Sequence, residues 1–299
     1  MSKKNLLDFI IVGAAKSGTT SIYNYLIQHP AIFMPECKEP HFLVKNKIAG
    51  KIDNWTDTER EYIALFETLE GNLIKGEASV FYLYFFDEAI KNIKKYIGEE
   101  TKILIVLRNP LDRAFSAWRY VRKAGKEPHS FSESLRKEEG RKDLDVTPMM
   151  QYISCSLYYE QVKAYMENFN NVKVIIFEEF LNEKNKDIQE ICRFLNIDDS
   201  FDFDTDSIHN ANENDWKYNQ KYTRLFTTDS NFKNFTKKIL SHNIFIYKLA
   251  QKVFHRVFTS KKKYQLQINE RQKYMKFFEE DISNLENLLQ RDLDIWRKK

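Results

Sequence analysis

The sequence predicts an α/β fold of three layers, in which a central parallel sheet lies between helices, with a helical appendage toward the C-terminus. Short apolar runs rich in β-branched residues alternate with longer segments of helical period, as in repeated βα units. Right-handed crossovers in such units place helices on both faces of the sheet. We therefore expect one domain over residues 1–299, with a helical insertion at about 208–265.

The elements follow in order along the chain. The predicted strands are Phe9 to Val12, Leu73 to Gly76, Lys102 to Leu107 and Val172 to Phe177. The predicted helices are Ser21 to Gln28, Glu59 to Leu69, Asp87 to Ile97, Leu111 to Ala124, Leu157 to Phe169 and Ile188 to Leu195. No strand pattern follows Ser207, and basic sequence of helical period extends through Phe258. The segment from Ile268 to Trp296 predicts one amphipathic helix on the sheet, with apolar residues Tyr274, Phe277, Phe278, Ile282, Leu285, Leu288, Leu289 and Leu293.

The composition excludes several classes of protein. With 42% hydrophobic and 30% charged residues, the chain is neither a disordered protein nor a coiled coil. Lys and Arg number 47 against 43 Asp and Glu, a net charge of +4 that suits an anionic ligand but is too small to indicate a nucleic-acid partner. The three cysteines lack the spacing of a zinc site or a disulfide framework, so we expect no metal and a reducing compartment.

The N-terminal segment is predicted to be a buried strand. Its basic start and apolar run superficially resemble a signal peptide, but Asp8 interrupts the run and a glycine-bearing loop follows directly. No other segment approaches the roughly 20 apolar residues that a membrane-spanning helix requires. We therefore expect a cytoplasmic protein that does not span a membrane.

The first strand leads into a loop that suits an anion. The sequence Gly13-Ala-Ala-Lys-Ser-Gly-Thr-Thr-Ser21 precedes a helix of apolar period. Its glycines let successive N–H groups turn toward one anion, while Lys16 adds charge and the threonines add hydroxyl donors. We predict a P-loop-type phosphate site, the alternative being a glycine turn that only starts a helix. A Walker A motif would place lysine at the position of Thr19.

A second anion site is predicted where the strand Lys102 to Leu107 ends. Arg108 follows this strand, and Arg113 and Ser116 lie at i and i+3 in the next helix. Open α/β sheets bind ligands at the carboxyl ends of their strands, so these side chains are predicted to clamp a second phosphate. Kinases typically place a metal-binding aspartate at such a strand end. The arginine instead favours a nucleotide with an extra phosphate, bound without obligatory Mg²⁺; a surface arginine beside a capped helix is the alternative.

With these loops the sequence resembles the sulfotransferases that use 3′-phosphoadenosine 5′-phosphosulfate (PAPS), most closely the heparan sulfate sulfotransferases and their bacterial relatives. The likeness rests on the two loops and on three further segments: Lys38-Glu-Pro-His-Phe42, Ser156-Leu-Tyr-Tyr-Glu-Gln161, and Phe278 to Glu286 with Arg291 to Trp296. It covers nearly the whole chain. The family implies a P-loop-type fold, PAPS as co-substrate, PAP as product and no required metal.

The resemblance also implies roles for individual residues. The 5′-phosphosulfate loop would comprise Lys16, Ser17, Gly18, Thr19, Thr20 and Ser21, and the 3′-phosphate would be bound by Arg108 and Ser116, with Arg113 in support. Glu39 would be the catalytic base, with His41 as the competing candidate, and Lys16 would stabilise charge on the leaving PAP. From the residues alone, Glu39 fits a surface carboxylate equally well, and a structural histidine is the commoner explanation of His41.

Two features depart from the family. Several heparan sulfate sulfotransferases carry a lysine in a Glu-Lys-Thr/Ser segment, where this chain has Glu77-Ala78-Ser79. A clear Lys-Gly-Arg type loop near the 3′-phosphate is also absent, and Lys217, Lys221 and Arg224 are candidate replacements.

We expect transfer of a sulfuryl group from PAPS to a hydroxyl or amine of an acceptor. A glycan or glycolipid is favoured by the relatives, with a lipid-linked precursor or a small hydroxylated metabolite as alternatives. Two other functions stay open. A P-loop small-molecule kinase would turn over ATP with Mg²⁺, and a non-catalytic nucleotide or polyanion binder would account for the missing lysine.

Overall fold

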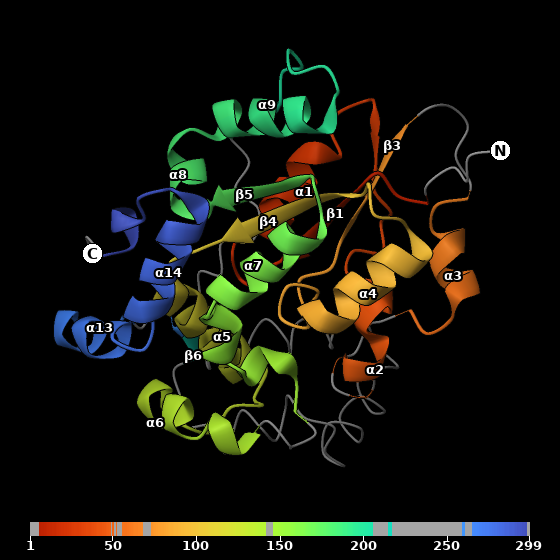
Figure 1. The fold of residues 1–299 in the computed structure, drawn as a ribbon. Coiled ribbons are helices and arrows are strands. Elements are labelled where there is room, and N and C mark those ends of the chain that lie inside the picture. Colours follow the sequence, from red (N-terminus) through yellow and green to blue (C-terminus); the bar gives the residue numbers. More distant parts are fainter. Residues whose placement is uncertain are drawn as a thin grey trace, which may run out of the picture.

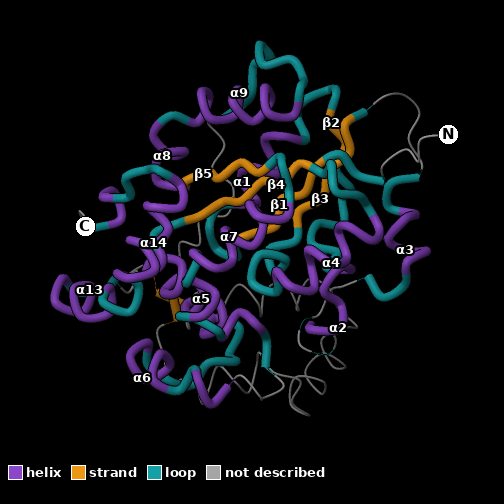
Figure 2. The backbone as a smooth tube through the Cα atoms, in the orientation of Figure 1, coloured by secondary structure: helices purple, strands orange, loops and turns teal. Residues whose placement is uncertain are grey.

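A parallel sheet forms the middle layer of the protein (Figures 1 and 2). The computed structural model describes residues 6–48, 50, 52, 56–67, 73–141, 146–205, 215–216, 259–260 and 265–297. The five strands lie in the order β2-β3-β1-β4-β5. They are β1 (Phe9–Gly13), β2 (Ile32–Phe33), β3 (Ile74–Ala78), β4 (Lys102–Leu107) and β5 (Val172–Ile176), and all neighbours pair in parallel. The predicted three-layer α/β class is confirmed.

Helices cover both faces of the sheet (Figure 1). They are α1 (Thr19–Leu26), α2 (Lys45–Ile48), α3 (Glu59–Ala64), α4 (Phe86–Tyr96), α5 (Pro110–Lys123), α6 (Phe131–Arg136), α7 (Tyr159–Asn168), α8 (Phe177–Asn182), α9 (Lys184–Leu195), α13 (Ile268–Met275) and α14 (Glu279–Leu289). In β1, Ile10 and Val12 join the core beneath α4, α5, α7 and α14, whereas Phe9 and Ile11 join the core beneath α1, α8 and α9. This alternation follows from the period of two in a strand.

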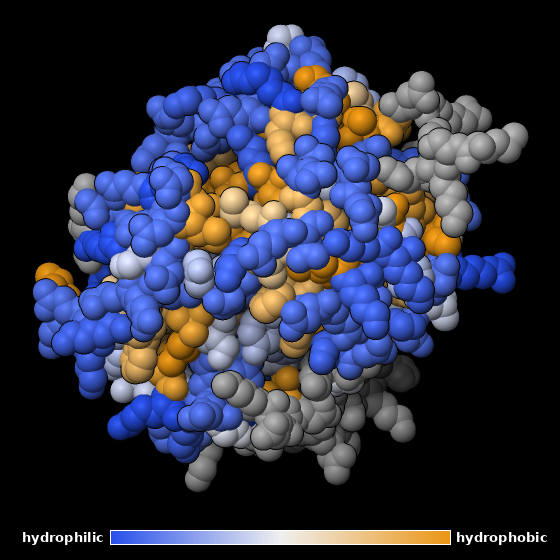
Figure 3. All heavy atoms as spheres, in the orientation of Figure 1, coloured by the Kyte–Doolittle hydropathy of each residue, from blue (hydrophilic) through white to orange (hydrophobic). Residues whose placement is uncertain are grey.

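The space-filling view shows how polar and apolar residues are distributed over one face of the molecule (Figure 3). Seen from the side of Figure 1, the molecule is mostly hydrophilic, with apolar side chains visible between the elements (Figure 3). None of the helices in the described residues is long and apolar enough to cross a membrane.

Several boundaries differ from the sequence predictions for local reasons. Helix α3 ends at Ala64 rather than extending to Leu69, because Leu65 and Phe66 donate to carbonyls only three residues back and tighten the last turn. Strand β3 continues to Ala78, and Phe177 begins α8 instead of ending β5. Strand β2 and helix α8 were missed because each is too short to show a period.

The expectation of one continuous C-terminal helix was wrong. The chain forms two helices, α13 and α14, separated at residues 276–278. At this break the backbone N–H groups of Phe277 and Phe278 donate to the carbonyls three residues earlier, those of Tyr274 and Met275. The break turns Phe278 into the core and leaves Phe277 49% exposed. Helix α14 packs beside α7, and Trp296 beyond it is buried and donates to the Glu178 carboxylate at 2.8 Å.

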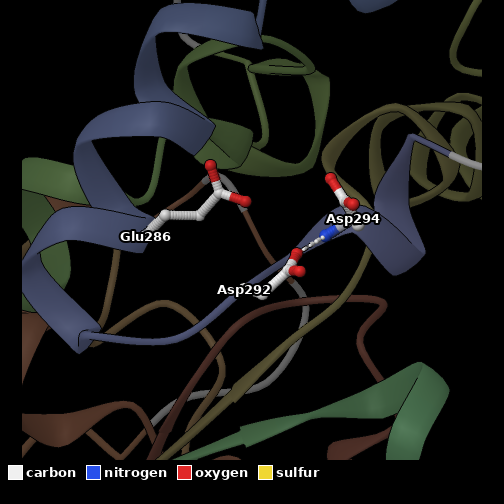
Figure 4. A group of neighbouring side chains, drawn as sticks. All are labelled: Glu286, Asp292 and Asp294. Carbon is white, nitrogen blue, oxygen red and sulfur yellow. Dashed lines mark hydrogen bonds between the residues drawn. The ribbon is translucent and has the colours of Figure 1, made fainter.

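Three acidic side chains lie close together at the C-terminal end of α14 and in the segment that follows it. Glu286, Asp292 and Asp294 converge in Figure 4. The Glu286 carboxylate accepts from the backbone of Leu293 at 2.9 Å and from Arg297 at 2.6 Å, and Asp292 accepts from the backbone of Asp294 at 2.6 Å. These carboxylates are therefore already paired with protein donors.

The predicted insertion at about 208–265 lies mostly outside the described residues, together with Lys217, Lys221 and Arg224. Two pieces of it are described: β6 (Asp215–Trp216) and β7 (Thr259–Ser260) pair as an antiparallel ladder. The expectation that strands end before Ser207 was therefore wrong. Strands of two residues are too short for an alternating pattern to reveal.

Candidate active site

A cavity of about 560 Å³ opens at the carboxyl ends of β1 and β4. It is lined by Ala15, Lys16, Gly18, Thr19, Thr20, Ser21, Glu39, Val80, Arg108, Asp112, Phe115, Ser116, Arg119, Tyr120, Met149 and Phe177. These residues come from the β1–α1 loop and the start of α1, the loops after β2 and β3, the end of β4, one side of α5, the segment before α7 and the start of α8. The predicted anion loops therefore share one cavity, at the sheet edge where ligands bind in open α/β folds.

The β1–α1 loop leaves helix N–H groups open at the cavity wall. Gly18 is the N-cap of α1 with φ 90, and it has no side chain to cap the helix. The first N–H groups of a helix have no acceptor within the helix, so those of Thr19 and Thr20 are available to an anion. A side chain at Gly18 is excluded, because its Cβ would lie 2.3 Å from the Phe177 ring.

Ser17 is placed differently from the rest of this loop. Lys16, Gly18, Thr19, Thr20 and Ser21 all line the cavity, whereas the Ser17 side chain is fully buried beneath it. The backbone N–H of Ser17 donates to Ala14 at 3.2 Å within the loop. Its position therefore indicates that it shapes the loop.

Lys16 holds positive charge over the cavity. Its ammonium lies 4.6 Å from the centroid of the Tyr120 ring. Burial lowers the pKa of Lys16 to about 8; the Glu39 carboxylate opposes this shift, and the charges of Arg108 and Lys38 add to it. Because burial is the main cause of this shift, an anion in the cavity would favour the charged form of Lys16.

Arg108 is fixed at the end of β4 from two sides. Its guanidinium donates to the Lys16 carbonyl at 3.3 Å and lies 5.5 Å from the centroid of the Phe177 ring. The Tyr158 hydroxyl donates to the Arg108 carbonyl at 3.0 Å. Ser116 lines the same cavity from α5. Arg108 and Ser116 are therefore brought to one site, as the sequence predicted.

Arg113 does not join them. It is fully buried and donates to Ser156 Oγ at 2.7 Å and to the Tyr152 carbonyl at 2.9 Å. The face of α5 that meets the cavity comprises Asp112, Phe115, Ser116, Arg119 and Tyr120. Arg113 lies seven residues before Tyr120 and so on the same side of α5, but its guanidinium is held by Ser156 and Tyr152. The expectation that Arg113 clamps a phosphate was wrong, and it instead ties α5 to the segment before α7.

Arg119 and Tyr120, which were not predicted as site residues, add a cation and an aromatic ring to the cavity wall. The signal was present, because Arg119 and Tyr120 follow Ser116 at i+3 and i+4 and so share its face. Phe177 was assigned to a strand, which concealed its contact with the loop. Asp112 also lines the cavity, and Arg271 of α13 pairs with its carboxylate at 2.7 Å.

Glu39 reaches the cavity from the loop after β2. Its backbone N–H donates to the Ala78 carbonyl at 3.0 Å, which ties this loop to the end of β3. The Lys38 ammonium lies 2.5 Å from Glu39 Oε1, and His41 Nε2 lies 3.4 Å from Oε2. Although burial raises it, the pKa of Glu39 falls to about 2 because of the His41 hydrogen bond and the Lys38 charge. Glu39 is therefore ionised in this arrangement.

His41 lies behind Glu39 and outside the cavity. Its side chain is 2% exposed, whereas that of Glu39 is 32% exposed. The ring packs beside Phe81 and Tyr82, and Nδ1 has no hydrogen-bond partner among the described residues. The His41 backbone N–H donates to Ser79 Oγ at 3.0 Å. This position suits a residue that orients Glu39.

A buried carboxylate supports this loop from below. Ser79 Oγ donates to Glu77 Oε1 at 2.5 Å, and the Tyr62 hydroxyl donates to Oε2. Burial raises the pKa of Glu77. Through Ser79, Glu77 is linked to the His41 backbone, and both Glu39 and His41 hold left-handed conformations with φ 66 and 51. The segment Glu77-Ala78-Ser79 therefore positions the loop that carries Glu39.

Comparisons with known proteins agree with this geometry. Residues 6–286 match the family model described as a sulfotransferase domain. The crystal structure of a sulfotransferase from Alicyclobacillus acidocaldarius is 31% identical, covers 98% of this chain and 99% of its own, and superposes with a TM-score of 0.72.

Curated relatives match over shorter stretches. Carbohydrate sulfotransferase 15 of Rattus norvegicus is 24% identical over 164 residues, which is 42% of this chain and 29% of that protein. A membrane-associated sulfotransferase of Dictyostelium discoideum is 29% identical over 115 residues, 38% of this chain and 23% of that protein. The chain thus spans less than a third of the length of these relatives. On the match of its residues 6–286 and the likeness over 98% of its length, the chain belongs to the sulfotransferase domain family.

Proposed function

We propose that this sulfotransferase moves a sulfuryl group from PAPS to a hydroxyl or amine of an acceptor, with a glycan or glycolipid as the favoured acceptor. The observation that carries the proposal is one cavity that holds an open helix N-terminus, the cations Lys16 and Arg108, and the carboxylate of Glu39. A donor with phosphates at both ends of its nucleoside needs two separated cationic contacts, and a transfer reaction needs a base beside them.

The residues present fit PAPS. The N–H groups of Thr19 and Thr20 and the ammonium of Lys16 suit the 5′-phosphosulfate, because helix N-termini favour anions. Arg108 and Ser116 suit the 3′-phosphate. Glycine at position 18 keeps the loop in this conformation, since a Cβ there would collide with the Phe177 ring.

Each protein group then has a task in the reaction. PAPS, when bound, supplies an activated sulfuryl group that is transferred in line between two oxygens, as in phosphoryl transfer. Glu39 accepts the acceptor proton while the acceptor oxygen bonds to sulfur and the bond from sulfur to the phosphate oxygen breaks. General base catalysis contributes about 10² to 10⁴ in rate. Lys16 and the loop amides stabilise the charge that develops on the departing oxygen.

Glu39 is proposed as the base in preference to His41. The Glu39 carboxylate lines the cavity, and the His41 side chain is buried behind it. A base must reach the proton that it removes, either directly or through one water. His41 is proposed to orient Glu39 through the contact at 3.4 Å.

Calorimetric titration tests the donor. We expect PAP to bind without Mg²⁺ and in the presence of EDTA, and more tightly than ATP. The kinase alternative requires preference for ATP with Mg²⁺, which would contradict the proposal. Binding of PAP without any sulfated product would support the alternative of a non-catalytic binder.

Mass spectrometry tests the acceptor. Glycans, lipids and metabolites extracted after co-expression are expected to contain a species that gains one sulfate, absent when Glu39→Gln is expressed instead. The name of the carbohydrate sulfotransferase 15 relative supports a glycan. If only small metabolites gain sulfate, the acceptor is a small metabolite and the proposed glycan acceptor is wrong.

We also propose that the protein works in a reducing compartment such as the cytoplasm. Cys37, Cys155 and Cys192 are all free thiols. Cell fractionation with an antibody to a tagged chain tests this location, and recovery in an oxidising compartment would contradict it.

A further inference from the structure

Lys38 lies between the two halves of the site. Its ammonium donates to Thr20 Oγ1 at 3.0 Å on the donor side and to Glu39 Oε1 at 2.5 Å on the acceptor side. The side chain is 17% exposed, so it is largely held within the wall that Thr20 and Glu39 form. An ammonium has three N–H donors, and within the described part of the chain these two contacts leave one for another acceptor.

The contact with Thr20 prepares that hydroxyl for an anion. Because an ammonium only donates, Thr20 Oγ1 must be the acceptor in this bond. The hydroxyl proton of Thr20 is then left for a different partner, and Thr20 lines the cavity. Lys38 therefore biases Thr20 toward donating into the site.

The contact between Lys38 and Glu39 makes Glu39 a weaker base. Both carboxylate oxygens of Glu39 have partners, Lys38 on Oε1 and His41 on Oε2. The pKa of Glu39 is about 2 in this arrangement. A general base is most effective when its pKa lies near the working pH, so a carboxylate held in this way is a poor proton acceptor.

An anion placed beside Thr20 competes with Glu39 for the same ammonium. Lys38 has a flexible four-carbon stem and a point charge that can exchange one oxygen partner for another. Sulfuryl oxygens beside Thr20 would offer this ammonium such an alternative partner.

We propose that Lys38 is a further catalytic residue, which transfers its contact from Glu39 to the sulfuryl oxygens of the bound donor and thereby frees Glu39 as a base only when the donor is in place. The ammonium keeps its protons throughout, and only its acceptor changes. This inference rests on the proposed function, because it requires that PAPS is the donor.

The first test compares PAPS with PAP, which lacks the sulfuryl group. In Lys38→Met we expect PAPS to bind about tenfold more weakly, the size of a lost charge-assisted hydrogen bond. PAP should bind to Lys38→Met within about twofold of its wild-type affinity. PAP has no sulfuryl oxygens, so the variant loses no hydrogen bond to it. Lys38→Arg, which keeps the charge, should recover part of the loss. Lys45→Met is the matched control, because Lys45 is a neighbouring lysine that pairs with Asp57, whereas Lys38 contacts Thr20 and Glu39.

The outcomes are distinct. Equal losses for PAPS and PAP would show that Lys38 only shapes the loop through Thr20, and no loss for either would show that it does not contact the donor; both overturn the proposal. If wild type binds neither compound, the proposed function itself fails.

The second test follows the Glu39 carboxyl directly in the wild-type protein. In ¹³C-glutamate-labelled wild type, with the Glu39 signal assigned from Glu39→Gln, PAPS should raise the apparent pKa of the Glu39 carboxyl further than PAP does, because both ligands bring negative charge but only PAPS brings the sulfuryl oxygens. In Lys38→Met the pKa should already be raised without ligand. An identical Glu39 signal in the PAPS and PAP complexes would overturn the switch.

Discussion

Phe177 lies against Gly18, so closely that a Cβ on Gly18 would come within 2.3 Å of its ring. Gly18 also holds φ 90, a conformation that side chains disfavour. Phe177, the first residue of α8, thus packs against the N-terminus of α1. Its ring limits how closely the β1–α1 loop can approach α8. Steric contact and backbone conformation both require glycine at this position.

Gly18→Ala is therefore expected to distort the β1–α1 loop and to weaken PAP binding by at least about tenfold, as measured by calorimetry. Left-handed strain costs about 1–3 kcal/mol, and the clash with Phe177 adds to it. Gly50→Ala is the control, because Gly50 has φ 76 but no atom within 4 Å of the added Cβ. That variant should lose stability through strain alone and keep PAP affinity. Wild-type PAP affinity in Gly18→Ala would contradict the role of the loop.

Glu39→Gln is expected to lower turnover by about 10² to 10⁴, the contribution of a general base, with PAP affinity unchanged. The amide keeps the shape of the side chain but accepts no proton. Turnover and calorimetry on the same preparation measure the two effects. Glu36→Gln is the control, since Glu36 is an exposed carboxylate in the same loop. Lost PAP binding in Glu39→Gln would show that the carboxylate holds the loop instead of acting as the base.

Local patterns were enough to predict four of the five strands of the main sheet, the β1–α1 loop and the β4–α5 junction. Each of these is a contiguous segment whose apolar run, glycines and cap determine its own geometry. Strand β4 was predicted with its observed limits. Asn109 is the N-cap of α5, which agrees with Pro110 as the first residue of that helix. These are interactions between residues close in sequence.

The rest of the site depends on contacts between distant segments. Thr20 and Lys38 meet only because β2 returns the chain to the edge of the sheet, and β2 has two residues. Arg113 is kept out of the cavity by its bonds to Ser156 and to the Tyr152 carbonyl, residues about 40 positions away whose approach no spacing on α5 predicts. The burial of His41 behind Glu39 likewise follows from the packing of Phe81 and Tyr82, which no local pattern contains.

Lys16 predicts the alkaline side of the pH dependence. Its pKa is lowered from 10.5 to about 8, so in the free protein the ammonium is charged below about pH 8 and neutral above it. PAP affinity should therefore fall as the pH rises through about 8, when measured by calorimetry across that range. Lys16→Arg keeps its charge and should move the decline to higher pH. An affinity that is constant through this range in wild type would show that Lys16 does not contact the anion.

Ser79→Ala tests whether the buried Glu77 network positions the base. The variant removes the acceptor of the His41 N–H and a donor to Glu77, both buried, and unpaired buried groups cost about 1–3 kcal/mol each. We expect a lower free energy of unfolding in urea and a fall in kcat, with PAP affinity retained because the donor loop is separate. Ser283→Ala is the control, since its exposed hydroxyl only donates within α14. A variant that loses stability but keeps the kcat of wild type would show that the network supports the fold without orienting Glu39.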